Sequence, residues 1–375
     1  MRGHIAKKGK KYYIVVDIGI VDGKRKQKWL GGFDTRAEAE EALPRILNII
    51  YQNKNKLLER KTFGELLDLW LNTVAKNRVS LSTFQSYSSS IALHIKPFLG
   101  DYELSKLTPM DLQKYYQHIM TEKGLSSTLA LYHHRIIHQA LDYAVKMDML
   151  EKNPADYVDP PRKRSYQPSI WDEKIVKKAL EIFKETNIRI PVLLAIYTGM
   201  RIGEIAALKW DDIHLEQGYI TVNKTLMKIN GQTYIKEKAE NKNSYRIVAI
   251  SNQVTEELKE WKAKQEKLKK ELKELYHDEG FVCTFEDGRV QDPKYITKVF
   301  QKIIEKHRLP KIRFHDLRHT HASLLLKHGI DPKHISDRLG HSTITTTLNI
   351  YSHVFDEKRR KVAETFEDIL NNQQK

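Results

Sequence analysis

The first regular pattern along the chain is a run of aromatic and β-branched residues from Tyr12 to Ile18, which predicts a β-strand. A tight turn is expected at Asp22-Gly23, and residues 24–30 then continue as a second or third strand. Alternate positions of a strand share one face, so this last strand is expected to present a lysine face made of Lys24, Lys26 and Lys28.

A helical pattern follows the strands. Thr35 and Glu38 have capping-box spacing and predict a helix that runs to about Tyr51, with a kink or a break at Pro44. Residues 54–61 are expected to be a charged hinge. Residues 1–58 are therefore predicted to form a small sheet packed on one helix.

Apolar residues with helical spacing dominate the next part of the chain. A second capping box at Thr62 and Glu65 opens a helix, and further helices are expected around residues 87–95, 109–124 and 126–147. Asn153-Pro154 stops the last helix, and residues 160–164 predict an extended basic linker. Residues 62–155 are thus predicted to be an all-helical domain whose first helix has a core stripe of Phe63, Leu66, Leu67, Trp70 and Val74.

Helices and short strands mix beyond residue 168. An apolar run covers residues 190–197, a helix is expected to begin at Arg201, and short strands are expected at residues 219–222, 234–236 and 245–250. Residues 254–279 predict a solvated surface helix or a helical hairpin, and a last helix is expected at about 356–370. The predicted fold class is a multidomain, mainly α protein with small β-sheets, in which residues 168–375 form a mixed α+β domain.

Charge narrows the class of partner. The 375 residues carry 64 Lys and Arg against 48 Asp and Glu, a net charge of +16, which favours a polyanion such as nucleic acid. Residues 1–61 hold 15 basic and 7 acidic residues, or +8 of that excess. No apolar run approaches the roughly 18 residues that a membrane span needs, and no signal-peptide pattern follows Met1, so no membrane partner is expected. The single cysteine, Cys283, excludes an intrachain disulfide and fits a reducing cytoplasm.

Reactive side chains cluster in residues 314–353, at spacings that a hydrophobic core does not require. His315 and Arg318 are expected on the solvent-exposed face of a helix, opposite a buried face made of Leu317, Leu324 and Leu325. A short second helix through residues 335–339 separates the glycine caps Gly329 and Gly340. His341 follows the second cap and Tyr351 comes ten residues later. An arginine, two histidines and a tyrosine delivered by short capped elements favour a site that binds a phosphate and attacks it.

Two structural alternatives compete with this interpretation. His315 and His319 have the spacing of two zinc ligands on one helix, and a zinc cluster would also draw on His321, His341 and His353. No glutamate follows His315, no cysteine lies near, and an intervening arginine would repel the ion. The second alternative makes Tyr351 an ordinary, partly buried tyrosine.

Five separated motifs carry a resemblance to a known family. They are TGMRIGEIAALKWDDI around Arg201, AENKNSYRIVAI around Lys242, and then HDLRH, LGHS and NIYSHV. In this order and spacing the chain resembles the tyrosine recombinases, specifically the integrases of phages and conjugative transposons. The resemblance places a catalytic domain at residues 168–375, a core-binding helical domain at 62–155 and an arm-type DNA-binding domain at 1–58.

The resemblance implies a role for each motif residue. Tyr351 would be the nucleophile that forms a 3′-phosphotyrosine and frees a 5′-hydroxyl, while Arg201 and Arg318 clamp the phosphate. Lys242 would be the general acid, although Lys224, Lys236 and Lys238 lie near it in the sequence. The last members of the site would be His315 and His341, with roles that the sequence does not divide between them.

The implied reaction needs no cofactor and no metal, because a phosphotyrosine preserves the phosphodiester energy for religation. The implied partners are double-stranded DNA with core-type and arm-type sites, three further copies in a homotetramer on DNA, and accessory proteins for DNA bending and excision. The expected location is the cytoplasm of a bacterial host. Candidate DNA-binding residues are the basic ones of the sheet and the linker: Lys10, Lys11, Lys24, Lys26, Lys28, Arg162, Lys163 and Arg164.

Two other functions stay open on the sequence. A type IB topoisomerase would use the same site, but DNA relaxation alone does not require two upstream DNA-binding modules. A non-enzymatic DNA-binding regulator would have no use for Tyr351.

Overall fold

The structure is a computed structural model that describes residues 3–21, 24–58, 61–162, 169–229, 231–237 and 245–340, with the backbone alone at 17–21, 24–26 and 50–58. The chain divides into two compact units, Met1–Ser165 and Tyr166–Lys375. The proposed last helix at 356–370 lies outside the described residues. None of the described helices combines the length and the apolar composition of a membrane span.

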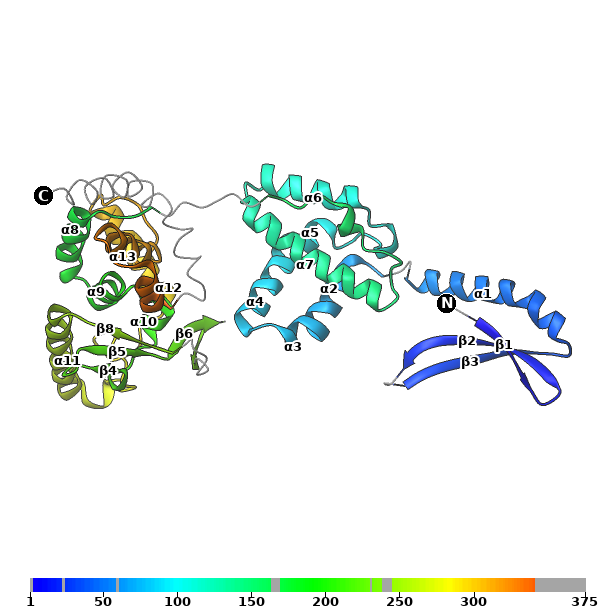
Figure 1. The fold of residues 1–375 in the computed structure, drawn as a ribbon, viewed down its shortest axis with the longest axis horizontal. Helices are drawn as coiled ribbons and strands as arrows, with labels where there is room; N and C mark the ends of the chain where they lie inside the picture. The colour runs from blue at the N-terminus through cyan, green and yellow to red at the C-terminus, as the bar shows by residue number, and fades with distance from the viewer. Residues whose placement is uncertain are drawn as a thin grey trace, which may run out of the picture. The chain divides into compact units, whose positions relative to one another are not determined.

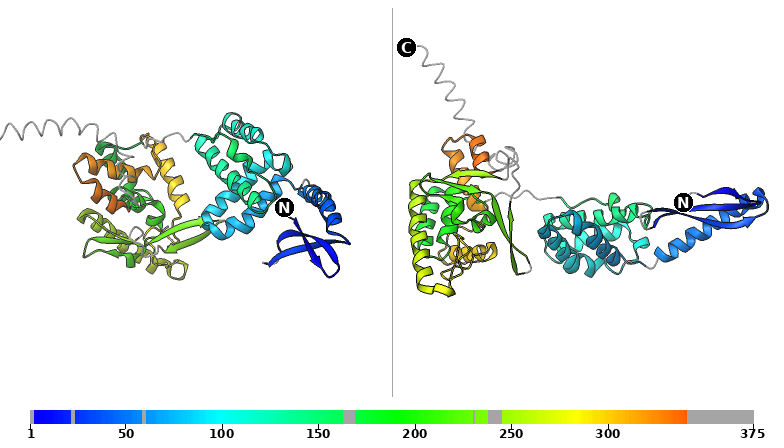
Figure 2. Two further views of the ribbon diagram at one scale, coloured as in Figure 1. Left: turned by 45° about the vertical axis from the view of Figure 1, so that its right-hand side comes forward. Right: turned by 90° about the horizontal axis from the view of Figure 1, so that it is seen from below.

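A three-stranded antiparallel sheet and one helix open the first unit (Figure 1). The strands are β1 (Gly3–Lys8), β2 (Lys11–Val21) and β3 (Lys24–Phe33), with β2 in the centre, and the helix is α1 (Arg36–Leu58). The helix lies along one face of the sheet, because a side chain at Gly3 would meet Leu43 and Leu47 of α1 (Figure 2). The predicted sheet with one helix is confirmed, and residues 3–8, which precede the strand predicted from Tyr12, form the additional strand β1.

Helix α1 corrects two expectations. It continues through Pro44 to Leu58, so the expected break is wrong, and residues 54–58 are helical rather than a hinge. A proline inside a helix removes one hydrogen bond, but the sheet supports α1 on both sides of this gap. Ala39 before the proline is fully buried, and Leu47 after it packs over Gly3. Tertiary packing therefore outweighs the local penalty.

The rest of the first unit is helical, as predicted. Thr62 caps the first helix in a reciprocal bond pair with Glu65, and Thr108 does the same with Asp111 for a later helix. The stripe that begins at Phe63 is buried in one core cluster. The elements are α2 (Phe63–Trp70), a π-turn at Leu71–Ala75, α3 (Lys76–Arg78), α4 (Leu81–Ser90), a π-turn at Ile91–Ile95, α5 (Lys96–Leu99), a 3-10 turn at Leu104–Lys106, α6 (Pro109–Thr121), α7 (Ser127–Lys146) and a 3-10 turn at Pro154–Tyr157.

The second unit mixes helices with two small antiparallel sheets. One sheet has the order β4-β5-β8 and the other pairs β6 with β7. The strands are β4 (Ile213–His214), β5 (Tyr219–Val222), β6 (Lys224–Ile229), β7 (Gln232–Glu237) and β8 (Arg246–Ala249). The helices are α8 (Glu173–Lys184), α9 (Arg189–Thr198), α10 (Ile202–Ala206), α11 (Asn252–Leu272), α12 (Pro293–Lys306), α13 (Asp316–Lys327) and α14 (Pro332–Leu339), with 3-10 turns at Trp210–Asp212 and Lys273–Leu275.

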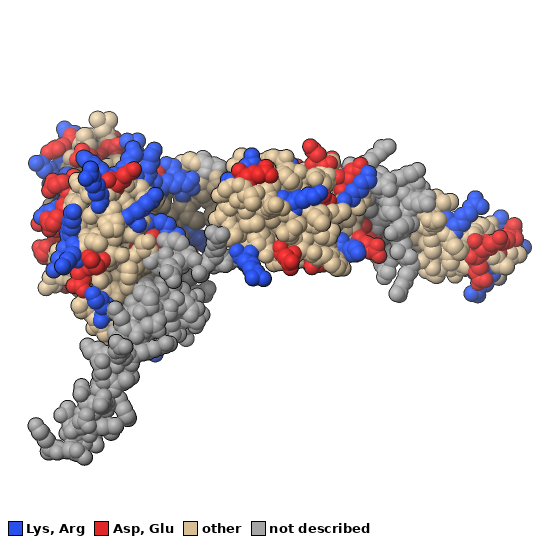
Figure 3. Space-filling view, turned by 90° about the horizontal axis from the view of Figure 1, so that it is seen from above, with Lys and Arg blue, Asp and Glu red and all other residues tan. Residues whose placement is uncertain are grey.

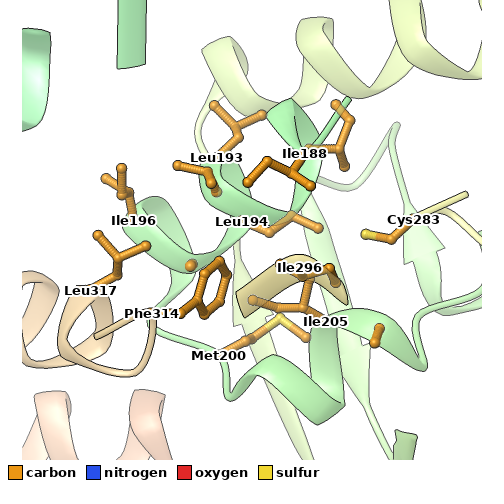
Figure 4. Packing of buried hydrophobic residues seen from close by; sticks show 14 of the residues in the cluster. Ile188, Leu193, Leu194, Ile196, Met200, Ile205, Cys283, Ile296, Phe314 and Leu317 are labelled. Atoms are coloured by element: carbon orange, nitrogen blue, oxygen red, sulfur yellow. The ribbon is translucent and has the colours of Figure 1, made fainter. Parts of the chain in front are cut away.

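The core of this unit lies around α9, whose residues 190–196 are all buried. Met200, just before Arg201, and Phe314 and Leu317, beside His315 and Arg318, belong to the same apolar cluster. Figure 4 shows Phe314 and Leu317 beside Ile196 of α9, with Met200 below them. Burial of these neighbours brings two motifs that are far apart in the sequence to one place.

Three expectations for this unit are wrong in part. Strands β4 and β6 add to the three that the alternation predicted. Helix α11 is a single helix with a buried face that includes Leu258 and Gln265, rather than a hairpin or a fully solvated element. Helix α13 has no fully solvent-exposed face, because both polar and apolar residues are buried along it. The buried residues are Asp316, Leu317, Arg318, His319, Thr320, Ala322, Ser323 and Leu326.

Candidate active site

Arg201 occupies the junction between α9 and α10. Gly199 ends α9 in the left-handed conformation, with φ of +65°, and Arg201 becomes the N-cap of α10. Glu204 accepts a hydrogen bond from the Arg201 backbone N–H at 3.0 Å and from Nη1 at 3.2 Å. The Arg201 side chain remains 42% exposed, and its Nη2 donates to the Gly340 carbonyl at 3.1 Å. Arg201 is therefore half-exposed and oriented from two sides.

Arg318 is held beside the same junction. It lies in the first turn of α13, is buried, and donates from Nη1 to the Gly199 carbonyl at 2.8 Å. Its acceptor thus lies two residues before Arg201. The structure brings these two predicted residues together, and planar guanidinium groups suit bidentate binding of phosphate oxygens.

His315 completes the described part of the predicted site. It occupies the N-cap position of α13, makes no capping hydrogen bond with its side chain, and is more exposed than the residues that follow it. Desolvation of the ring, followed by the positive charges of Arg318, Arg313 and Arg201, lowers the pKa of His315. The imidazole is therefore kept neutral, so it offers one donor and one acceptor nitrogen.

His319 is buried one helical turn further on, with its ring edge-on to that of His315 at a centroid distance of 5.1 Å. Burial lowers the pKa of His319 to about 4, with a further contribution from His315. Among the described residues, His and carboxylate ligand atoms gather within metal-binding reach at His138, Asp142 and Asp156 of the helical region, and not at His315 and His319. The other histidines of the zinc alternative include His341 and His353, outside the described residues.

A buried ion pair lies next to Arg201 and was not predicted from the sequence. Glu204 binds Arg246 of β8 through two hydrogen bonds, Nη1 to Oε1 at 3.2 Å and Nη2 to Oε2 at 2.7 Å. In strand β8 the arginine is buried and the adjacent isoleucine is not: Arg246 is buried, while Ile247 is 57% exposed. Hydrophobicity alone would have placed Ile247 on the buried face. The only signal in the sequence was that Arg246 lies two positions before Val248, so the two side chains share a face.

Arg338 and His321 form a second unpredicted contact, at the end of α14. Arg338 donates from Nε to His321 Nε2 at 3.2 Å and from Nη2 to the Tyr197 carbonyl at 2.9 Å. Since Nε2 accepts, the His321 proton sits on Nδ1 and is donated to the Ile196 carbonyl at 2.8 Å. Burial, then the charge of Arg338, lowers the pKa of His321 to about 4. These bonds tie α14 to α9.

Lys242, His341 and Tyr351 lie outside the described residues. Lys242 falls in the connection between β7 and β8, and His341 directly follows Gly340, whose carbonyl accepts from Arg201. Among the alternative lysines, Lys224 is engaged with Asp212 at 2.9 and 3.3 Å, and Lys236 lies on the exposed strand β7. Lys238 is outside the described residues.

Only part of the predicted lysine face lies within the described side chains. Lys28 is exposed and pairs with Val16, so it shares the side of the sheet that holds Ile14 and Leu30, while only the backbone of Lys24 and Lys26 is described. The lysine face therefore stays a prediction. The opposite face carries Tyr13 edge-on to Trp29, which is 46% exposed and lies under the Lys8 ammonium.

Of the other candidate DNA-binding residues, Lys11 contacts Asp34 at 3.6 Å, and Lys10 and Arg162 are exposed. Lys24 and Lys26 lie on β3, and Lys163 and Arg164 are outside the described residues. On the face seen in Figure 3, basic and acidic side chains intermingle over the second unit. A site for an anion in that unit is therefore better judged from local clusters such as Arg201 with Arg318 than from the net charge.

Three family profiles match the chain. The phage integrase family matches residues 171–358, an N-terminal SAM-like domain of phage integrases matches residues 62–120, and an arm DNA-binding domain matches residues 4–50. The first match spans both described arginines of the site.

Similar proteins agree with these profiles. The XerC-like tyrosine recombinase of Caldanaerobacter subterraneus subsp. tengcongensis is 30% identical over 387 residues, covering 97% of this chain and 98% of that protein. The ICEBs1 integrase of Bacillus subtilis is 26% identical, covering 90% and 91%.

Solved structures show the same fold. The Tn1549 transposon integrase in complex with a circular intermediate DNA has a TM-score of 0.68 at 21% identity, covering 81% of this chain and 99% of that one. A λ integrase dimer bound to a COC′ core site has a TM-score of 0.60 at 18% identity, covering 92% and 94%.

Proposed function

The chain belongs to the phage integrase family of tyrosine recombinases, enzymes that cut and rejoin DNA through a tyrosine nucleophile, and we propose that Tyr351 is that nucleophile. It is a site-specific recombinase of the kind that integrates and excises mobile DNA. The observation that carries the residue assignment is the position of the two arginines at one junction: Arg318 donates to the Gly199 carbonyl, two residues before Arg201, and Arg201 donates to the Gly340 carbonyl. That bond ties the phosphate-binding arginine to the segment that leads to His341 and Tyr351.

The proposed role of the two arginines is to neutralise the negative charge of the phosphate. The tyrosine oxygen forms a bond to phosphorus, and the bond from phosphorus to the 5′-oxygen breaks. Negative charge on the non-bridging oxygens rises through the pentacovalent transition state, and preorganised donors stabilise it without reorganisation. Arg318 is preorganised by burial and its Gly199 acceptor, and Arg201 by Glu204 and Gly340. Loss of either guanidinium is expected to slow cleavage by at least about a hundredfold.

Two protons move in this step. The tyrosine hydroxyl, whose ordinary pKa is about 10, must lose its proton, and the departing 5′-oxygen must gain one. A neutral His315 or His341 suits the first transfer or donates to the phosphate, and the lowered pKa of His315 supports the neutral form. Lys242 is proposed as the acid for the second transfer, and the hydrogen bonds that Lys224 donates to Asp212 support the choice of Lys242 over Lys224.

Two kinds of DNA site are proposed for the upstream modules. The arm-type site would be read by the open face of the sheet, where Tyr13, Trp29 and Lys8 combine aromatic surface with positive charge. The core-type site would be gripped by the helical region and the catalytic unit. Deleting residues 1–58 removes only the first of these contacts.

A homotetramer on DNA is proposed, because exchange between two duplexes needs four strand cleavages. The stripe of Val362, Phe366, Ile369 and Leu370 would dock on a neighbouring copy. A hollow of about 560 Å³ on the catalytic unit is a suitable acceptor, since four helices line it with apolar residues such as Leu180, Ile196, Leu324 and Ile335, next to charged ones such as Glu173 and Lys177. Truncation after Val354 should leave single-site binding intact and impair synapsis. Normal recombination by the truncated protein would contradict this docking.

The remaining partners are proposed on the same basis. DNA-bending and excision proteins would set the direction of recombination, and the bacterial cytoplasm would supply both the DNA and the reducing conditions that suit the lone, buried Cys283.

The experiment that tests the function uses a plasmid with two recombination sites and a matched plasmid without them. A recombinase joins the paired sites into new circles and leaves the matched plasmid unchanged. A chelator should not alter the rate, since no step is assigned to a metal. Relaxation of both supercoiled plasmids at equal rates, without recombinants, would instead favour a type IB topoisomerase.

A further inference from the structure

One buried carboxylate stands between two arginines of the catalytic unit. Glu204 Oε1 accepts from Nη1 of both Arg201 and Arg246, each at 3.2 Å. Its Oε2 accepts from the Arg201 backbone at 3.0 Å and from Arg246 Nη2 at 2.7 Å. The side chain of Glu204 is 1% exposed and that of Arg246 is 7% exposed. The two arginines therefore share one negative charge, unequally.

Arg246 interacts more strongly with the Glu204 carboxylate than Arg201 does. It contributes two side-chain hydrogen bonds, including the shortest of the set, from a buried position where the electrostatic attraction is weakly screened. Arg201 contributes one side-chain bond from a half-exposed position. The Arg201 charge is thus left largely available to an incoming anion.

Arg246 also holds the end of α14. Its Nε donates to the Arg338 carbonyl at 2.9 Å, and its Cδ and Nη1 lie 3.1 Å from the position that a side chain at Gly340 would occupy. Strand β8 is thereby joined to the last turn of α14, next to the carbonyl that receives Arg201.

We propose that Arg246 is a positioning residue for DNA cleavage. It keeps Glu204 from neutralising Arg201, and it fixes the backbone from which residue 341 continues. This inference rests on the proposed function, in which Arg201 binds the phosphate that is cut. Without Arg246, Glu204 would keep a buried charge next to Arg201, so the phosphate would compete with this carboxylate for the Arg201 guanidinium.

The test measures single-turnover cleavage of a nicked suicide duplex at saturating enzyme. Arg246→Met should bind the duplex like the parent but cleave it roughly tenfold to a hundredfold more slowly, the range typical of a group that orients a neighbour. Arg246→Lys should recover part of the rate, because one charged donor returns. Arg289→Met is the matched control, since Arg289 is an exposed arginine of the same unit paired with Asp287.

Two further arms separate the electrostatic role from a merely structural one. The double variant Glu204→Gln with Arg246→Met removes both buried charges, so it should cleave faster than Arg246→Met, and it serves also if the single variant does not fold. A methylphosphonate at the cleavage position removes the phosphate charge that Arg201 binds. On that substrate the defect of Arg246→Met should shrink to within about threefold of the parent, about 0.65 kcal/mol at 1.36 kcal/mol per tenfold.

Parent-like cleavage of the ordinary duplex by Arg246→Met would overturn the inference. An equally large defect on the methylphosphonate, or a double variant as slow as the single one, would overturn the charge-sharing role. Tyr351→Phe is run in parallel. Cleavage by that variant would defeat the proposed function itself, whereas an inactive Tyr351→Phe beside a fully active Arg246→Met defeats only this inference.

Discussion

Gly199 offers a sharp test of how the catalytic unit is held together. Its φ of +65° lies in the left-handed region, and its carbonyl is the acceptor for Arg318. A methyl group at this position would lie 2.4 Å from Leu339 Cδ2 and 2.9 Å from His321 Cδ2. Neither neighbour can easily withdraw, because Leu339 is fully buried and the His321 ring is bonded at both nitrogens. Gly199→Ala should therefore disturb both stability and Arg318.

The expected cost has two parts. An L-residue in the left-handed region costs roughly 1–2 kcal/mol relative to glycine, and forcing a methyl group into a packed core costs about 1–3 kcal/mol. Gly199→Ala should thus lower the free energy of unfolding by about 2–5 kcal/mol. Gly218→Ala is the matched control, because its φ is +71° but the nearest atom, the Ile250 carbonyl oxygen, is 3.6 Å from the new methyl group. That variant should show only the conformational part.

Urea denaturation of each full-length variant measures the stability difference, and single-turnover cleavage measures the effect on Arg318. Gly199→Ala should cleave roughly tenfold or more slowly than the parent under conditions where it is folded, because the carbonyl that holds a transition-state donor moves. Gly218→Ala should cleave at the parent rate. Equal stability losses for the two variants, with equal cleavage, would refute the packing argument.

Three other predictions address separate parts of the chain. Lys242→Ala should cleave an ordinary duplex poorly but regain activity with a 5′-bridging phosphorothiolate, whose sulfur leaves without protonation, and no recovery would remove Lys242 as the acid. Burial, then His94, lowers the pKa of His133 from 6.5 to about 4. The unfolded chain therefore takes up a proton near pH 6.5 and the folded chain only near pH 4, so stability is full above pH 6.5 and falls by up to about 3 kcal/mol as the pH drops toward 4. His133→Gln should reduce the loss of stability between pH 7.5 and 4.5 in urea titrations, although the contributions of His319 and His321 remain. An unchanged pH dependence would exclude His133 as one of its sources. Deleting residues 1–58 should spare cleavage of a short core duplex, abolish recombination that depends on arm sites, and reduce the salt dependence of binding to DNA that carries both site types, as followed by fluorescence anisotropy. Specific binding of arm DNA by the deleted protein would contradict the assignment.

Local signals in the sequence were enough to predict most helix starts and stops. The capping box of Thr62 with Glu65 and the left-handed glycines Gly329 and Gly340 appear where the pattern placed them. Such devices depend on residues a few positions apart, so the local sequence carries the information. The all-helical region and the small N-terminal sheet followed from the same kind of pattern.

Features that depend on tertiary packing were not predictable in this way. Helix α1 passes through Pro44 because the sheet supports it on both sides of the proline. The burial of Arg246 in place of Ile247 depends on Glu204, 42 positions earlier. No local pattern reports a partner at that distance.

In the candidate site, too, the residues with local sequence signals could be predicted and the residues that depend on distant partners could not. Arg201, His315 and Arg318 could be proposed from residue type and spacing, and the structure brings them around Gly199 and Gly340. The residues that orient them, Glu204, Arg246 and Arg338, were not proposed, since a buried charge is recognised only once its partners are known.

The identity of the nucleophile is tested most directly by mapping the covalent bond. The protein is trapped on a nicked suicide duplex, digested with protease, and the DNA-linked peptide is sequenced by mass spectrometry. We expect a 3′-phosphotyrosine at Tyr351, and a Tyr351→Phe variant that binds the same duplex but forms no adduct. An adduct at another residue, or strand cleavage by Tyr351→Phe, would contradict it.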